Sequence, residues 1–195
     1  MLVKTYAAAV HGVDAQTITV EVNAGGEVPQ GQPFYHLVGL PDSAVKEGFQ
    51  RFEAALSNIG KKVPRLKLVV NMAPADIRKE GSAYDLPIAM GILGASEQMK
   101  SDNLGEYMMI GELSLDGGLR PIKGALPIAI QARSEKFKGL IVPKQNAREA
   151  AIVSNLAVYG IDNIKEAVAF FDGELELKPT ILDTRDAFAL SLIHI

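Results

Sequence analysis

One stretch, which runs from a buried strand through a polar loop into an apolar helix, constrains the fold of this chain most strongly. Lys67–Met72 is a short apolar run of the kind found inside a sheet. The polar loop over 74–82 interrupts it. Asp85 then stands where an N-cap belongs, and Pro87 lies just inside the helix, where its missing N–H costs nothing. The pattern predicts a strand, a loop and a helix over 85–98 that Asp85 caps.

The remaining segments indicate a mixed α/β fold, because early strands pair locally and later strands alternate with helices. Gln16–Val22 alternates polar and apolar residues, which is typical of a half-buried strand. A helix is expected between its cap, Asp42, and its closing glycine, Gly60. The other expected strands cover 1–10, 34–38, 107–110, 139–142 and 157–161, a hairpin turn covers 116–118, and further helices cover 124–135, 145–153 and 163–171.

Composition places the chain among soluble globular proteins and excludes several kinds of site. The 195 residues suffice for one sizeable domain, and the net charge of −3 argues against a generally basic, nucleic-acid-coating protein. The absence of cysteine excludes disulfides and thiol chemistry. The sequence shows neither a signal-peptide core nor an apolar run of about 18 residues, so we expect a cytoplasmic protein without a membrane span.

Three sequence blocks carry a resemblance to a known family. They are Arg78–Ala89 (RKEGSAYDLPIA), the block from Gly111-Glu112 through Pro121-Ile122 to Gly124, and the strand Leu140–Pro143. In this order and spacing they resemble the proteolytic domain of Lon, and still more closely the amino-terminal, ChlI-type domain of the ComM (YifB) Mg-chelatase-like AAA+ ATPases. The resemblance covers roughly 12–173. It implies a fold like the second domain of ribosomal protein S5.

The same resemblance suggests how the chain is organised. Residues 1–173 form the Lon-like domain, and 174–189, which are charged and contain proline, read as a linker toward an AAA+ module. That module would carry the Walker motifs and bind ATP and Mg²⁺. Residues 190–195 (LSLIHI) are either a short apolar tail or the artefactual translation of a sequencing adapter.

Lon-type proteolysis needs a serine nucleophile and a lysine base. Aligned on the Lon pattern, the nucleophile position holds Asp85 and the lysine position holds Leu126, and neither side chain supports the reaction. We therefore expect no catalytic residue in this chain. A shifted alignment of the loop would bring Ser82 near the nucleophile position and Lys123 one turn from the base. The simpler interpretation of Ser82 is a loop or capping serine.

Cofactor and metal sites are not expected in this chain. The sequence holds no Gly-x-x-x-x-Gly-Lys-Ser/Thr phosphate loop. Its only histidines are His11, His36 and His194, which lack ligand-spaced partners.

Basic residues in two loops allow two interpretations. Arg78 and Lys79 precede the helix, whereas Arg120 and Lys123 follow the hairpin. If the loops are neighbours, these four side chains form a phosphate-contacting DNA patch. Alternatively, they pair with acidic residues or form subunit contacts in a ring; the candidate acidic partners are Glu80, Glu112 and Asp116. A further basic cluster, Lys61, Lys62 and Arg65, follows the first helix.

Three function classes follow from the resemblance. The first is a non-proteolytic assembly and DNA-contact domain of a ring-forming, hexameric branch-migration ATPase that acts in recombination and natural transformation. The second is an ATP-dependent Ser–Lys protease, and the third is a regulatory subunit like that of Mg-chelatase. The residues at the dyad positions favour the first over the second.

Overall fold

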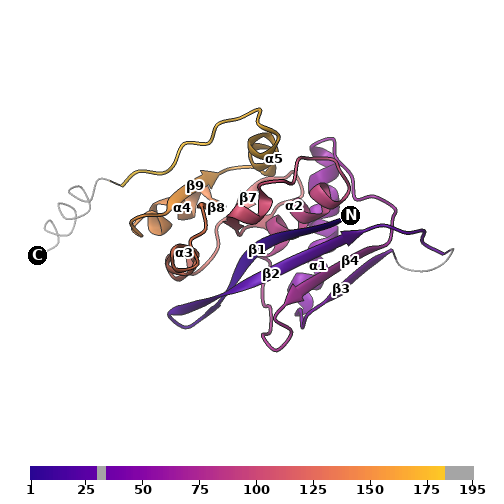
Figure 1. Cartoon of the computed structure of the whole chain (residues 1–195), viewed down its shortest axis with the longest axis horizontal. Coiled ribbons are helices and arrows are strands. Elements are labelled where there is room, and N and C mark those ends of the chain that lie inside the picture. Colours follow the sequence, from indigo (N-terminus) through magenta and orange to yellow (C-terminus); the bar gives the residue numbers. More distant parts are fainter. Residues whose placement is uncertain (30–33, 183–195) are drawn as a thin grey trace, which may run out of the picture.

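A seven-stranded mixed sheet forms the centre of the molecule (Figure 1). The computed structural model describes residues 1–29 and 34–182. The sheet has the order β3-β4-β2-β1-β5-β8-β9. Its strands are β1 (Leu2–His11), β2 (Asp14–Ala24), β3 (Tyr35–Val38), β4 (Leu68–Ala73), β5 (Tyr107–Met109), β8 (Gly139–Pro143) and β9 (Ala157–Ile161). A separate two-stranded hairpin consists of β6 (Glu112–Leu113) and β7 (Leu119–Arg120).

The two halves of the sheet pair differently, as the order of elements predicts. β1 and β2 form an antiparallel hairpin, and β4 continues it in antiparallel pairing with β2. From β1 onward through β5, β8 and β9 all pairs are parallel, as they are between β3 and β4. Parallel neighbours need a crossover, and the helices supply it. The mixed α/β fold expected from the sequence is confirmed.

Helices α1 (Ser43–Asn58) and α2 (Asp85–Ala95) pack together on one side of the sheet. α2 lies against β1 and β2, and every one of its residues is buried. A Cβ at Gly91 would come within 2.6 Å of Val22, so this glycine sets how closely the helix approaches the sheet. Thr5 donates its hydroxyl to the Pro87 carbonyl (2.9 Å) and thereby satisfies a buried polar group.

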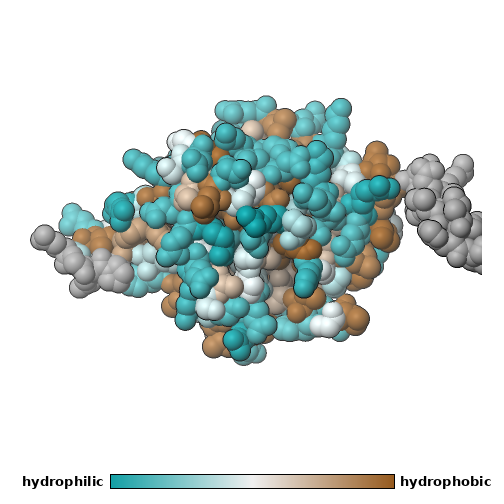
Figure 2. All heavy atoms as spheres, turned by 180° about the vertical axis from the view of Figure 1, so that it is seen from behind, coloured by the Kyte–Doolittle hydropathy of each residue, from teal (hydrophilic) through white to brown (hydrophobic). Residues whose placement is uncertain are grey.

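Of the remaining helices, α3 (Ala125–Ser134) and α4 (Lys144–Ala150) lie in the crossovers of the parallel half, and α5 (Ile164–Asp172) follows its last strand. α3 reaches the opposite face of β1 and β2, where Gln131 donates to Thr17 (3.1 Å). A short 3₁₀ turn, η1 (Leu104–Glu106), leads into β5. Seen from behind, the surface is mostly hydrophilic, with apolar residues in separate small groups (Figure 2).

Most predicted boundaries agree with the structure to within a few residues. Asp42 accepts a hydrogen bond from the Val45 N–H (2.9 Å), so the predicted cap of α1 is confirmed. Gly60 adopts the left-handed conformation expected after a helix. α2 ends at Ala95, three residues before the predicted end, and Gln98 instead bonds to the loop after α1.

The segment that follows α5 begins by running beside the domain. The Thr180 N–H donates to the Val158 carbonyl (2.7 Å) on β9, and Leu177 packs against the core. Of the linker expected over 174–189, the structure describes residues 174–182. The expected tail over 190–195 lies outside the described residues. Within the described ranges, none of the helices is long and apolar enough to cross a membrane.

Candidate functional site

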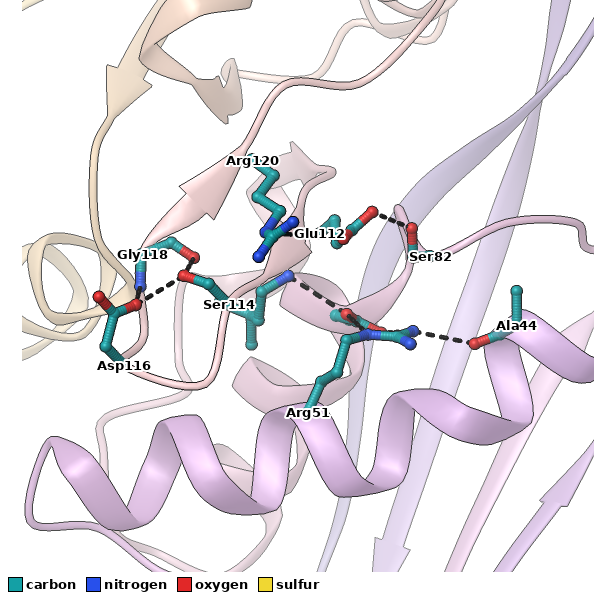
Figure 3. Close-up of polar contacts among 10 residues, drawn as sticks. Ala44, Arg51, Ser82, Glu112, Ser114, Asp116, Gly118 and Arg120 are labelled. Carbon is teal, nitrogen blue, oxygen red and sulfur yellow. Dashed lines mark hydrogen bonds and ion pairs between the residues drawn. The ribbon is translucent and has the colours of Figure 1, made fainter.

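The start of α2 is where the loop over 74–84 meets the β6–β7 hairpin (Figure 3). The Gly111 N–H donates to the Ala83 carbonyl (2.8 Å), and the Leu86 N–H donates to the Gly111 carbonyl (3.1 Å). β6 also contacts α1. The structure thus brings together the two loops that the sequence predicts to be neighbours.

Asp85 does not cap α2, and that prediction is wrong. Asp85 is the first residue of the helix; Tyr84 is the N-cap, and within the described structure it makes no side-chain capping bond. The Asp85 side chain is only 2% exposed and points toward α1. Its carboxylate remains favourable at the positive end of the helix dipole, but it takes its hydrogen bonds from elsewhere in the fold.

A bidentate ion pair with Arg51 replaces the predicted cap. Arg51 donates from Nε to Asp85 Oδ2 (2.7 Å) and from Nη2 to Asp85 Oδ1 (3.0 Å). Its Nη2 also donates to the Ala44 carbonyl (2.9 Å), and the Leu113 N–H donates to Asp85 Oδ2 (3.2 Å). One carboxylate therefore links α1, α2 and β6.

Burial disfavours the charged form of Asp85, whereas its hydrogen-bond donors favour that form. Burial raises the pKa of Asp85 to about 6, although Arg51 and the Leu113 N–H lower it. The hydrogen bond to Asp85 raises the pKa of Arg51. A Cβ at Gly48 would lie 2.5 Å from Asp85 Oδ1, so only glycine at this position lets α1 approach the carboxylate.

Ser82 and Lys123, the alternative dyad residues, line one pocket of about 360 Å³ together with Glu112. The Ser82 hydroxyl donates to Glu112 Oε2, and Arg120 Nε lies 3.9 Å from the other carboxylate oxygen (Figure 3). Ser82 is therefore hydrogen-bonded to a carboxylate, whereas Lys123 is exposed at the rim.

Leu126, at the position that aligns with the Lon lysine, carries no ionisable group. Its side chain is partly buried against the core. Its backbone N–H donates to Glu149 Oε1 (3.1 Å) near the start of α3. The position therefore serves packing and satisfies a free backbone donor in the first turn of α3.

Lys79 does not lie on the surface, which removes it from the predicted DNA patch. Its side chain is fully buried, and its ammonium donates to the Pro74 carbonyl within the same loop. Burial lowers the pKa of Lys79. Its backbone holds the loop beside the segment before α1, because the Asp42 N–H donates to the Lys79 carbonyl (2.9 Å).

Two of the other predicted patch residues are paired with acids. Arg78 lies 3.2 Å from Glu80, and Arg120 approaches Glu112 at 3.9 Å. These are two of the pairings that the alternative interpretation names. In residues 1–29 and 34–182, Lys123 is the one of the four that is exposed and outside an ion pair.

The sequence reasoning missed Arg51, which is the main partner of Asp85. The available signal was weak: one arginine beside the buried positions Gly48 and Phe52 of an amphipathic helix. Among the residues that the structure describes, no group of three or more His, Asp or Glu side chains could hold a metal ion.

Comparisons with known proteins identify the family. The family model described as "Subunit ChlI of Mg-chelatase" matches residues 20–146. This chain belongs to the ChlI family. It is 41% identical to competence protein ComM of Haemophilus influenzae over 172 residues, and 40% identical to the uncharacterized protein YifB of Escherichia coli over 186 residues. These alignments cover 88% and 94% of this chain, but only 33% and 35% of the relatives.

More distant relatives agree with this placement. An uncharacterized protein of Mycobacterium bovis is 32% identical over 194 residues, 98% of this chain and 38% of the relative. Lon protease 2 of Bacillus subtilis is 28% identical over 138 residues, 71% of this chain and 24% of that protein. The predicted resemblance to the ComM/YifB group is confirmed, and the likeness to Lon is weaker. The chain spans about a third of the length of its ComM and YifB relatives.

Proposed function

We propose that this ChlI-family domain is a non-proteolytic accessory module of a ComM-like AAA+ ATPase. The observation that carries the proposal is the engagement of Asp85. At the position where Lon has its nucleophile, this chain has a carboxylate bound by Arg51 and the Leu113 N–H. A carboxylate in that bonding arrangement holds three elements together and provides no hydroxyl for attack.

The alternative pair, Ser82 and Lys123, supports the same conclusion. Attack by a serine in Ser–Lys chemistry requires a neutral, desolvated lysine that accepts the hydroxyl proton. Here the Ser82 hydroxyl donates to Glu112, and Lys123 is exposed at the pocket rim, so it lacks the desolvated position that this chemistry needs. This arrangement favours structural bonding of Ser82 over proton transfer to Lys123.

We further propose that the parent protein is a ring-forming, hexameric ATPase that drives DNA branch migration in recombination. The support is the family and the likeness to ComM, which is named a competence protein. In this proposal ATP and Mg²⁺ bind an AAA+ module outside this chain. The domain contributes to assembly and contacts DNA.

A labelling experiment tests the non-proteolytic character. The chain is incubated with a fluorophosphonate and, separately, with a peptide boronate, with a Lon protease treated in parallel as the positive control. We expect an unmodified mass for this chain. A stoichiometric adduct at Ser82, abolished by Ser82→Ala, would overturn the proposal.

The accessory role is tested on the full-length protein. Analytical ultracentrifugation with ATP and branched DNA should show a ring, and ATPase assays should show stimulation by that DNA. Removal of residues 1–173 should weaken assembly or stimulation. If both remain unchanged, the domain is not an assembly or DNA-contact module.

A further inference from the structure

The loop between α1 and β4 concentrates positive charge on the surface. Residues 60–67 (GKKVPRLK) contain four cations and no acid. Lys62, Arg65 and Lys67 are exposed, and Lys61 is half-buried. None of the ion pairs in the described parts of the chain includes any of them. Like charges this close repel one another, so the loop favours an anionic partner.

The loop is held in place although it is neither helix nor strand. The Lys62 N–H donates to Gln98 Oε1 (3.0 Å), and Gln98 Nε2 donates back to the Lys62 carbonyl (2.8 Å). The Lys61 ammonium donates to the Gln98 carbonyl (2.6 Å), and Lys67 exchanges backbone bonds with the turn at Gly25 and Gly26. Ordering such a loop costs conformational entropy, and here that cost is met before any partner binds.

Arg65 is oriented by an aromatic side chain. Its guanidinium carbon lies 4.7 Å from the ring centre of Phe34, over the face of the ring. Phe34 itself packs edge-on against Phe49 of α1. The guanidinium is therefore anchored on one side, and its side chain is exposed on the other.

We infer that this loop, through Lys62, Arg65 and Lys67, is a docking surface for the phosphate backbone of nucleic acid. The inference deepens the proposed function, since it names where the module contacts DNA. It also moves that contact from the loops around Ser82 and Arg120, where acidic partners neutralise two of the arginines.

Two features favour a nucleic acid over an acidic protein as the partner. Cations placed on a preorganised loop match a regularly charged backbone, which releases counterions on binding. An arginine placed over an aromatic ring keeps its planar fork of donors free for a partner, and that fork suits phosphate oxygens. The exposed acid nearest to the loop in sequence is Asp76, which lies outside the ion pairs of the described residues.

The test compares three triple alanine variants of this chain that remove the same charge from different places. The first changes Lys62, Arg65 and Lys67. The second changes the sequence-predicted residues Arg78, Arg120 and Lys123. The third is a matched control at Arg133 of α3, Lys136 just after it and Arg148 of α4, which are exposed. Fluorescence anisotropy measures binding of a labelled 20-nucleotide single strand and of a duplex across salt concentrations, and circular dichroism melting confirms folding.

We expect the first variant to bind roughly tenfold more weakly at low salt than the unchanged chain. For the single strand, the slope of log K against log salt concentration should become shallower by about two, since three phosphate contacts contribute about 0.7 each. The second and third variants should bind within about twofold of wild type. Gln98→Ala, which keeps every charge, should weaken binding by a smaller factor, because it releases the loop.

Polyglutamate serves as a competing acidic polypeptide. Four outcomes would overturn the inference. Two concern the variants: loss of binding in the second variant with none in the first, or equal loss in all three. Two concern the unchanged chain: no salt-dependent binding, or tighter binding of polyglutamate than of DNA through the same loop. The first outcome would place the contact in the sequence-predicted patch and leave the proposed function intact. The non-proteolytic proposal is decided separately, by the labelling experiment.

Discussion

Arg51 and Asp85 meet through two hydrogen bonds although 34 residues separate them in sequence. The pair connects the middle of α1 with the first residue of α2, and the Leu113 N–H brings β6 to the same carboxylate. The Arg51 side chain is 22% exposed and that of Asp85 is 2% exposed. Loss of either charge should therefore destabilise the fold far more than loss of one partner of a surface ion pair.

Removing the arginine alone should strongly destabilise the fold. Arg51→Met keeps the packing length but leaves the Asp85 carboxylate buried without a counter-charge, which typically costs about 3–5 kcal/mol. Urea unfolding at neutral pH measures the loss. Adding Asp85→Asn to the Arg51→Met variant should recover most of it, because no buried charge then remains. If Arg51→Met unfolds at the same urea concentration as wild type, the ion pair is not a structural link.

The raised pKa of Asp85 predicts a specific pH dependence. Because burial moves this pKa from 3.8 in the unfolded chain to about 6 in the folded protein, the folded state binds the proton more tightly between these values. The free energy of unfolding should therefore fall as pH rises from about 4 to about 6, by the order of 1–3 kcal/mol. Asp85→Asn should lack this component.

The measurement is the difference in melting temperature between wild type and Asp85→Asn across that pH range, which cancels the titration of other groups. In Arg51→Met the fall should continue above pH 6, since Arg51 no longer opposes the raised pKa of Asp85. A constant difference between wild type and Asp85→Asn from pH 4 to pH 6 would contradict the assignment.

Gly48 should tolerate no side chain. A methyl group there would lie 2.5 Å from Asp85 Oδ1, a carboxylate that Arg51 fixes in position. Overpacking of this kind costs about 1–3 kcal/mol, which outweighs the helix propensity that alanine adds. Gly105→Ala is the control, because its Cβ would meet only Tyr6 at an ordinary 3.7 Å. Thermal melting of the two variants should separate them; equal melting temperatures would refute the prediction.

The local elements were predictable because their signals are local. Strand alternation, the cap at Asp42 and the closing Gly60 each depend on residues a few positions apart, and the structure confirms them. The role of Asp85 depends on a partner 34 residues away, whereas the local pattern of a carboxylate at a helix start predicts only a cap. The hydrophobic periodicity of α2 does not show that Arg51 of α1 supplies the hydrogen bonds to the Asp85 carboxylate.

Lys79 failed as a prediction for a related reason. A lysine among Arg78, Glu80 and Gly81 reads as a solvated loop residue, since nothing in its neighbours is apolar enough to suggest burial. In the fold, the loop turns back on itself, and the buried Lys79 ammonium donates a hydrogen bond to the Pro74 carbonyl. Whether a loop folds back in this way depends on tertiary contacts, which the sequence pattern does not report.

Lys79 should therefore act on stability and leave nucleic-acid binding unchanged. Lys79→Ala removes a fully buried side chain and leaves a cavity. For a side chain of this size, the loss in free energy of unfolding is about 2–5 kcal/mol. Lys79→Met fills most of that space and loses only the bond to the Pro74 carbonyl, so its cost should be clearly smaller. Urea unfolding gives the order. Anisotropy with single-stranded DNA should give the same affinity and salt dependence for Lys79→Met as for wild type. A shallower salt dependence in that variant would mean that the Lys79 ammonium reaches phosphate, which its burial forbids.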